Sequence, residues 1–184
     1  MLFRSTHTVT INDDDQLTVS FVADTNVNEA DTNHNVGVTV TFTGSIERNV
    51  VLPISLAAGS TATVTDDYTR PATLTIPQAT TSGSTVNYVV AVKQDTVIEG
   101  AETVNLTFGT LPGTAQAGAD TAHTVTINDD DQLTVSFVAD TNVNEADTNH
   151  NVGVTVTFTG LTLATDVVLP ISLAAGSTAT VTDD

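Results

Sequence analysis

Apolar and polar residues alternate along most of this chain, which is the pattern of a half-buried β-strand. In the first run, Leu17, Val19 and Phe21 are separated by Thr18 and Ser20, so the apolar side chains share one face. Six further runs alternate in the same way, around residues 36–42, 50–56, 74–76, 86–92, 104–108 and 125–127. Threonine on the polar face favours a pleated sheet over a helix. The pattern therefore predicts about seven strands.

Seven short strands joined by polar turns are typical of an immunoglobulin-like antiparallel β-sandwich, and this all-β fold is the class we predict. The third run contains Pro53, which has no backbone N–H to donate to a neighbouring strand. We therefore expect an edge strand or a bulge at that position.

The chain repeats itself. Residues 7–44 recur without one change at residues 123–160, which is an offset of 116 residues. A second identical stretch occupies residues 50–67 and again residues 167–184. A period of this length is the size of a small domain and indicates a tandem array of similar modules.

Each repeat restarts at the sequence QLTVSF, which sets the module boundaries. Residues 1–15 are predicted to be the last strand of a preceding, mostly absent module. Residues 16–131 form one complete module, called the central module below. Residues 132–184 form the N-terminal part of a third, incomplete module, which stops where the counterpart of Tyr68 would follow.

Composition narrows the possible partners. The chain has 4 lysine and arginine residues against 22 acidic ones, and its formal net charge is −18. This balance argues against nucleic acid or an anionic membrane as a partner and favours cations. No apolar run approaches the length of about 20 residues that a membrane span requires, so we expect no membrane insertion. The chain has no cysteine, which excludes disulfides and thiolate metal sites.

An enzymatic function is not expected. Aromatic residues make up only 4% of the chain and tryptophan is absent, so an aromatic-lined substrate cleft is hard to build. The sequence contains no nucleophile motif and no glycine-rich phosphate loop. A residue set copied in every repeat suits a structural or binding module better than a single catalytic centre.

Acidic residues of the central module gather near the expected strand ends. They form four groups: Asp24, Glu29 and Asp31; Asp66 and Asp67; Asp95, Glu99 and Glu102; and Asp129, Asp130 and Asp131. Two carboxylates about 4 Å apart repel by roughly 4 kcal/mol at an effective dielectric near 20, so a shared pole would need a counter-ion. Oxygen ligands alone suit a hard cation, and calcium with its flexible coordination fits better than magnesium or zinc.

Simpler roles exist for some of these residues. The run Asp129 to Asp131, taken alone, is also typical of a solvated linker or of a turn in which aspartates bond nearby backbone amides. The histidines, among them His34 and His123, have no cysteine and no close second histidine, so we expect them in surface or hairpin positions.

Three motifs in order carry a family resemblance. They are DDY at Asp66–Tyr68, QDTVIEGAETVNL at Gln94–Leu106 and TVTINDDD at Thr124–Asp131. Together they resemble the Calx-beta module, an immunoglobulin-like sandwich found in sodium/calcium exchangers, integrin tails and long repetitive bacterial surface proteins. Several members of that family bind calcium at one end. The resemblance covers residues 16–131 and, by repetition, both flanks.

The resemblance implies a set of calcium ligands. Side-chain ligands would be Glu29, Asp67, Asp95, Glu99, Glu102, Asp129, Asp130 and Asp131, and Val97 would offer its backbone oxygen. The chain departs from the family where Gln94 and Thr96 flank Asp95, because calcium-binding members usually carry consecutive aspartates there. Thr65 and Asp66 also replace the glycine that commonly precedes the aspartate–tyrosine pair. Fewer carboxylates imply fewer ions or weaker binding.

Two functions follow as hypotheses. In the first, the chain belongs to an extracellular or cell-surface structural or adhesive array, in which calcium at the module ends stiffens neighbouring modules. Any signal or anchor would lie outside this sequence. In the second, the chain is a self-assembling filament or surface-layer subunit whose copies join by strand pairing, with calcium incidental. The incomplete third module and the lone strand at residues 7–11 motivate this alternative.

Overall fold

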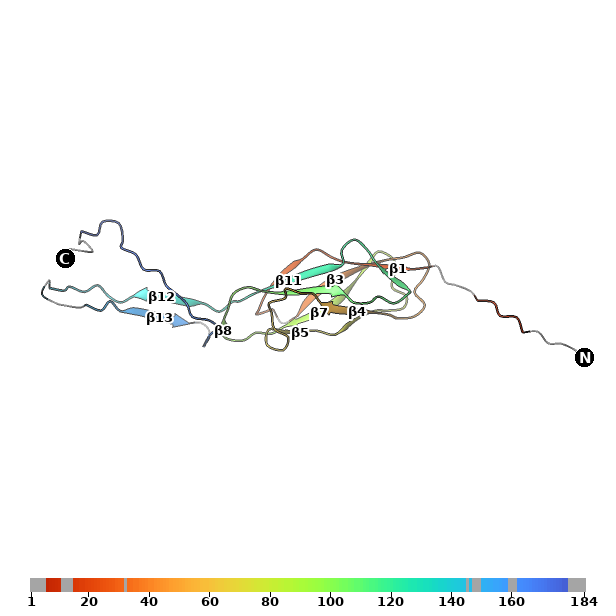
Figure 1. The fold of residues 1–184 in the computed structure, drawn as a ribbon, viewed down its shortest axis with the longest axis horizontal. Helices are drawn as coiled ribbons and strands as arrows, with labels where there is room; N and C mark the ends of the chain where they lie inside the picture. The colour runs from red at the N-terminus through yellow and green to blue at the C-terminus, as the bar shows by residue number, and fades with distance from the viewer. Residues whose placement is uncertain are drawn as a thin grey trace, which may run out of the picture.

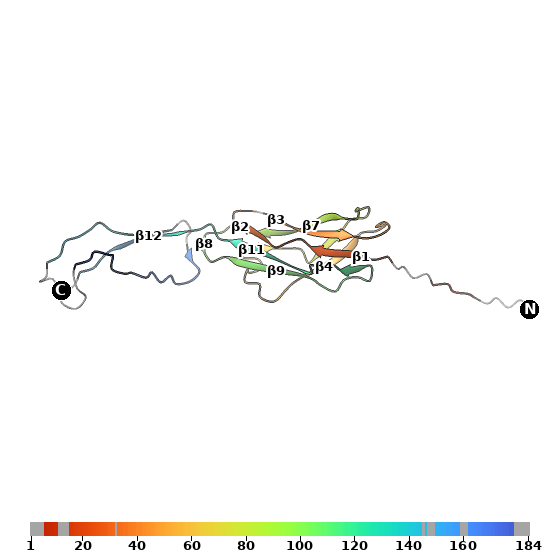
Figure 2. The same cartoon turned by 90° about the horizontal axis from the view of Figure 1, so that it is seen from above.

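Two five-stranded β-sheets packed face to face form the body of the molecule (Figure 1; Figure 2). The computed structural model describes residues 6–10, 15–31, 33–144, 146, 150–158 and 162–178. These described residues contain no helix, and so none that could cross a membrane.

The central module supplies all ten strands of these sheets. The first sheet has the order β10 (Ala115–Ala117), β1 (Leu17–Phe21), β3 (His34–Thr41), β7 (Ser84–Val92) and β5 (Tyr68–Thr69). The second has the order β2 (Thr25–Asn28), β11 (Ala122–Asn128), β9 (Glu102–Phe108), β4 (Val50–Leu56) and β6 (Thr73–Ile76). The all-β sandwich predicted from the alternating pattern is therefore confirmed.

The inward side chains of both sheets form one core. On β1, Leu17, Val19 and Phe21 are buried while the residues between them are half-buried. The ring of Phe21 stacks on the ring of Phe108 from the second sheet, with centroids 4.3 Å apart. Alternation with a period of two thus placed these side chains between the layers, as expected.

The first stretch of the module crosses from one sheet to the other. Only residues 22–24 separate β1 in the first sheet from β2 in the second. Each then gains a parallel neighbour, β10 beside β1 and β11 beside β2. These parallel pairs depart from the antiparallel pairing that the alternating pattern predicts, and the strands number more than the seven it predicts. The additional strands β2, β5, β8 (Val97–Ile98) and β10 have two to four residues and are too short to show alternation.

Pro53 does not lie in an edge strand, so that half of the expectation is wrong, and the bulge stays a prediction. Strand β4 lies between β9 and β6 in the second sheet. Its first half pairs with β6 as far as Pro53, opposite Thr73, and its second half pairs with β9 from Ile54 onwards. Proline is tolerated inside this sheet because it lies where the strand changes partner.

His123 is buried rather than exposed, contrary to the expectation for the histidines. Its Nδ1 lies 3.0 Å from the backbone oxygen of Val22, which can only accept, so Nδ1 is the protonated nitrogen. Its Nε2 lies 3.1 Å from the hydroxyl of Thr25, and the same hydroxyl lies 2.7 Å from His34 Nε2. This chain of hydrogen bonds ties together β11, β2 and β3.

Residues 6–10 show how much a strand depends on its partners. Their sequence is identical to residues 122–126 at the start of β11 except for the first residue, yet they form no strand. In β11 the same residues pair with β9, and the strand continues alongside β2. Residues 11–14 lie outside the described part of the chain, and the assignment of residues 1–15 to a preceding module stays a prediction.

The described part of the third module forms a hairpin. Strands β12 (Leu133–Phe137) and β13 (Val154–Phe158) pair antiparallel, with Val135 opposite Val156. This register repeats the pairing of Val19 with Val40 in the central module.

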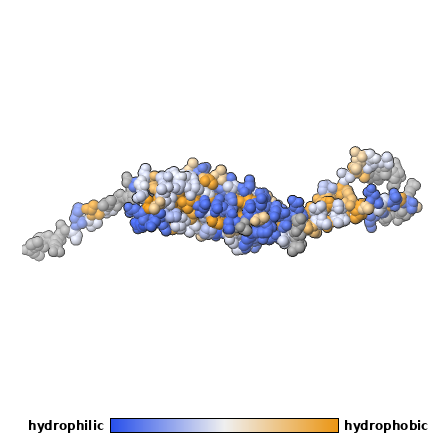
Figure 3. Space-filling model, turned by 180° about the vertical axis from the view of Figure 1, so that it is seen from behind, coloured by the Kyte–Doolittle hydropathy of each residue, from blue (hydrophilic) through white to orange (hydrophobic). Residues whose placement is uncertain are grey.

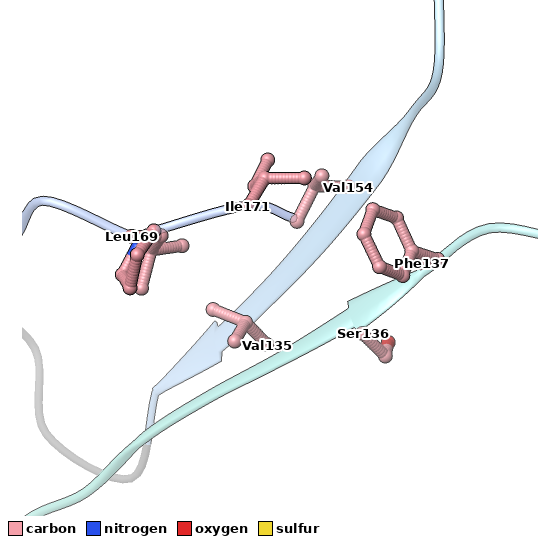
Figure 4. Close-up of a pocket in the computed structure, with 7 residues that line it drawn as sticks. Val135, Ser136, Phe137, Val154, Leu169 and Ile171 are labelled. Atoms are coloured by element: carbon pink, nitrogen blue, oxygen red, sulfur yellow. The ribbon is translucent and has the colours of Figure 1, made fainter. Parts of the chain in front are cut away.

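The hairpin exposes the side chains that the central module buries. Val135 is 41% exposed, whereas its copy Val19 is 0% exposed. The apolar side chains of this region are visible at the surface in Figure 3. In Figure 4, Leu169 and Ile171 face Val154 and Phe137 across an apolar hollow. The identical residues are exposed because no second sheet covers this hairpin among the described residues.

We predict that Phe21→Ala costs the central module about 3–5 kcal/mol of unfolding free energy, because it leaves a cavity opposite Phe108. The matched control is Phe137→Ala, the same residue in the third module, whose side chain is 62% exposed. Its cost should be within about 0.5 kcal/mol. Urea denaturation followed by tyrosine fluorescence measures both. Equal costs for the two variants would contradict the packing described here.

Candidate metal centre

The acidic residues meet where β2 and β11 end. These strands are parallel and in register, with Asn28 opposite Asn128, so the residues that follow them emerge side by side. The backbone N–H of Glu29 donates to the oxygen of Asn128 at 2.9 Å. Glu29 therefore lies beside Asp129 at one pole of the sandwich, although the two are 100 positions apart in sequence.

The first cluster consists of Glu29, Asp129 and Asp130. One carboxylate oxygen from each lies within 4.8 Å of the others. The side chain of Glu29 is buried, that of Asp129 is half-buried and that of Asp130 is exposed. Three carboxylates open to solvent on one side offer the oxygen donors that a hard cation requires.

The second cluster consists of Asp67, Glu99 and Glu102, again with oxygens within 4.8 Å of one another. Asp67 is buried and is held by backbone contacts: Thr63 N–H donates to its Oδ2, and Lys93 N–H donates to its backbone oxygen at 2.8 Å. Glu102 is the first residue of β9, opposite Ile127 of β11.

Asp129 connects the two clusters. Its Oδ2 accepts from the backbone N–H of Glu99 at 2.6 Å, and its Oδ1 accepts from the N–H of Asp131 at 2.8 Å. The aspartate run therefore makes the backbone-bonded turn considered as a simple alternative. The same turn places Asp129 and Asp130 in the first cluster.

Asp131 and Asp95 lie at the margin of these clusters. The Oδ2 of Asp131 is buried and has no hydrogen-bond donor among the described residues. Such an orphaned carboxylate oxygen is costly without a cation or water beside it. Asp95 Oδ1 accepts from the N–H of Val97 at 2.7 Å. The predicted ligand role of the Val97 backbone oxygen stays a prediction.

Mutual repulsion and burial shift the protonation of two glutamates. The pKa of Glu29 is raised from 4.5 to about 7, first by burial and then by the charge of Asp95. A hydrogen bond from the Asp95 backbone lowers this pKa, and the charges of Asp129 and Asp130 raise it further. The pKa of Glu102 is likewise raised to about 7, first by burial and then by its hydrogen bond with Asp67 and that residue's charge. Burial is the larger cause of both shifts, and the neighbouring carboxylates add to it.

Two further carboxyl groups show the same trend. Burial, followed by the charges of Asp67, Asp95 and Asp129, raises the pKa of Glu99. Desolvation and the neighbouring aspartates also raise the pKa of Asp131. In each case the charges that raise the pKa are other carboxylates, so the two clusters act as one acidic pole. The residues present fit a divalent cation.

Not every acidic residue near the start of the module joins the pole. Asp24 Oδ1 accepts from the N–H of Thr124 at 2.7 Å, and Asp31 Oδ2 accepts from the N–H of Asn28 at 3.1 Å. Both carboxylates thus bond to backbone and lie outside the two clusters.

Gln94 has a role that the sequence analysis missed. It was considered only as a lost ligand, yet its Nε2 donates to Asp130 Oδ1 at 3.0 Å and to the backbone oxygen of Asp95 at 3.1 Å. The amide therefore neutralises part of the repulsion in the first cluster. No local pattern in the sequence signals this contact, because Gln94 and Asp130 are 36 residues apart.

The family model of the Calx-beta domain matches residues 12–131 and again residues 128–184. No curated protein matches the chain by sequence. The crystal structure of CBD12 from CALX1.2 is similar, with 20% identity and a TM-score of 0.51 over 61% of this chain and 45% of that one. That likeness shows the fold alone. The apo-form Calx CBD1 domain is 19% identical, with a TM-score of 0.49 over 62% of this chain and 98% of that domain.

We predict that, without divalent cations, the folded protein becomes more stable as the pH falls from about 8 to about 5. Folded Glu29 and Glu102 bind protons near pH 7, whereas the unfolded chain binds them only near 4.5. The folded state thus holds more protons in this window, and stability rises with acidification. Thermal melts in EGTA across this pH range measure the effect.

The double variant Glu29→Gln and Glu102→Gln should have a higher melting temperature at pH 8 and a flatter pH dependence, and the exposed Glu47→Gln serves as control. Burial and the nearby His123 lower the pKa of His34, which acts in the opposite direction below about pH 6.5. Subtracting the melting temperature of the double variant from that of the native chain at each pH cancels the contribution of His34, which both proteins contain. Parallel curves for the native chain and the double variant would refute the prediction.

Proposed function

The chain belongs to the Calx-beta domain family, and on this basis we propose that its acidic pole binds calcium and stiffens the junction between consecutive modules. The observation that carries the proposal is the pair of all-carboxylate clusters at one end of the sandwich. The pair lies next to a buried carboxylate oxygen of Asp131 that has no donor among the described residues.

The concentration of carboxylates favours an acidic pole with bound calcium over one without an ion. Each cluster brings three carboxylates within 4.8 Å, and the pKa values of Glu29 and Glu102 are raised first by burial and then by these neighbouring carboxylates. A divalent cation would remove that repulsion and favour the ionised carboxylates. Calcium accepts six to eight oxygens in flexible geometry, which suits a pole built from several loops and strand ends.

The proposed affinity is that of an extracellular module. Gln94 and Thr96 flank Asp95 and supply no charge. With a dissociation constant near 10⁻⁴ M and about 1 mM calcium, each site would add roughly 1.4 kcal/mol to module stability. Because calcium reaches that concentration outside cells, we place the protein in an extracellular or cell-surface setting.

The position of the pole motivates the stiffening role. Asp129 to Asp131 end the central module, and the second family match begins at residue 128. An ion bound there would restrict the residues that connect one module to the next. This role is structural and involves no catalysis, and it would serve an adhesive or stalk-forming array.

We expect calcium titration by calorimetry to show binding in the range of 10⁻⁵ to 10⁻³ M, with a higher melting temperature in millimolar calcium than in EGTA. Asp130→Asn should weaken binding at the first cluster and Glu99→Gln at the second, because each removes one ligand charge. Asp120→Asn is the matched control, since Asp120 precedes β11 at the opposite end of that strand. Superimposed melts in EGTA and calcium would rule the proposal out.

Gln94→Asp should bind calcium roughly tenfold more tightly, because affinity rises with the number of ligand charges. The same change should lower the melting temperature in EGTA, since it replaces the hydrogen bond to Asp130 with repulsion. Gln78→Asp adds the same charge at an exposed position outside the clusters and should change neither quantity appreciably. A Gln94→Asp variant with unchanged affinity would argue against calcium at the first cluster.

A further inference from the structure

Residues 7–67 and their repeat at residues 123–184 are identical except in one segment. Residues 45–49 have the sequence SIERN, whereas residues 161–166 have the sequence LTLATD. In the third module this divergent segment contains β14 (Thr162–Leu163). Strand β14 pairs in parallel with β8 of the central module, Thr162 opposite Val97 and Leu163 opposite Ile98.

Backbone groups on both edges of β8 form hydrogen bonds. On one edge, the N–H groups of Val97 and Glu99 donate to Asp95 and Asp129, at 2.7 and 2.6 Å. These are residues of the acidic pole.

On the other edge, the backbone oxygens of Thr96 and Ile98 accept from Thr162 and Ala164, each at 3.3 Å. Because backbone groups of successive residues in a strand point to opposite sides, one short strand serves both contacts. Strand β8 thus contacts both the acidic pole and the next module, and Figure 1 shows it between the central sandwich and the hairpin of β12 and β13.

The corresponding segment of the central module folds differently. Ile46 packs against the core of its own module, and its backbone oxygen accepts from Ala79 N–H at 3.0 Å. Asn49 Oδ1 accepts from Gln78 N–H at 2.8 Å. The segment thus folds back on its own sandwich and forms no strand.

The two versions of the segment carry their charged residues at different positions. Counted from Gly44 and Gly160, Glu47 stands where β14 has Leu163, whereas the one charge of LTLATD is Asp166 at its end. Strand β8 is bounded by Asp95 and Glu99, so a glutamate brought against it would add to the repulsion at the pole. An uncharged strand with free backbone donors suits this edge.

We propose that the divergent segment of the third module is a docking strand, which adds β14 to β8 of the module before it, and that the uncharged residues of this strand favour the pairing. Modules with the LTLATD sequence would dock in this way, whereas the SIERN segment contacts Gln78 and Ala79 of its own module. The partner of this surface is therefore the preceding module of the same array. The proposal rests on this strand pairing and not on the proposed calcium site.

Amide hydrogen exchange of the full chain by NMR tests the pairing. The N–H groups of Thr162 and Ala164 donate to Thr96 and Ile98, whereas that of Leu163, the residue between them, points to the other side of the strand. Relative to their intrinsic rates, we expect the first two to exchange roughly tenfold more slowly than Leu163, as for marginal exposed hydrogen bonds. Equal exchange of all three amides, both in EGTA and in calcium, would overturn the proposal.

Proline variants test whether the pairing fixes the module junction. Thr162→Pro with Ala164→Pro removes both donors, whereas Leu163→Pro removes an N–H that points to the other side of the strand and is the matched control. The chain has no cysteine, so spin labels at Thr75→Cys and Thr155→Cys report one distance between the modules. The distance distribution should broaden in the double variant and stay narrow in Leu163→Pro. Identical distributions in both would overturn the proposal.

Replacing residues 161–166 with the SIERN sequence of residues 45–49 tests the role of the divergence itself. We expect this chimera to lose the protected amides and to show the broad distance distribution. A chimera that keeps both would overturn the assignment of specificity to this segment.

The outcomes also separate this inference from the calcium proposal. Protected amides without calorimetric calcium binding would refute the proposed function and leave docking intact. Calcium binding with unprotected amides would refute docking alone. The melting temperature of the central module in each variant shows that its fold is unchanged.

Discussion

The parallel pairing of β2 with β11 is the interaction on which both the fold and the acidic pole depend. It joins the first stretch of the central module to its last strand, and the buried Val27 and Ile127 lie opposite each other in that pairing. The same register makes Glu29 and Asp129 neighbours. The strand pairing that completes the sandwich therefore also concentrates carboxylates at one end.

The fold tolerates this concentration through three means visible in the structure. Backbone N–H groups donate to Asp67 and Asp129, Gln94 donates to Asp130, and Glu29 and Glu102 have pKa values raised to about 7. Burial is the first cause of the raised values, and the neighbouring carboxylates contribute after it. We propose that bound calcium offsets the repulsion among these carboxylates. The stability of the module would then depend on the surrounding calcium concentration.

Much of the sandwich could be predicted because its long strands alternate with a period of two, and each of the seven predicted runs became a strand. The short strands and the parallel pairs could not, because they depend on neighbours distant in sequence. The same limit applies to the pole. The motifs named acidic residues that the structure brings together, and their role as ligands stays a prediction. Gln94 as a donor and the burial of His123 arise from tertiary contacts that the motifs do not signal. The hairpin of the third module shows the same dependence on distant neighbours, because residues identical to the core of the central module are exposed there.

The central claim is that calcium occupies the acidic pole, and crystals grown in millimolar calcium test it most directly. Long-wavelength anomalous diffraction locates calcium without assuming where it binds. The account predicts anomalous peaks within bonding distance of Glu29, Asp129 and Asp130, and of Asp67, Glu99 and Glu102. Difference maps without a peak at either cluster, or with peaks only elsewhere on the acidic surface, would contradict it.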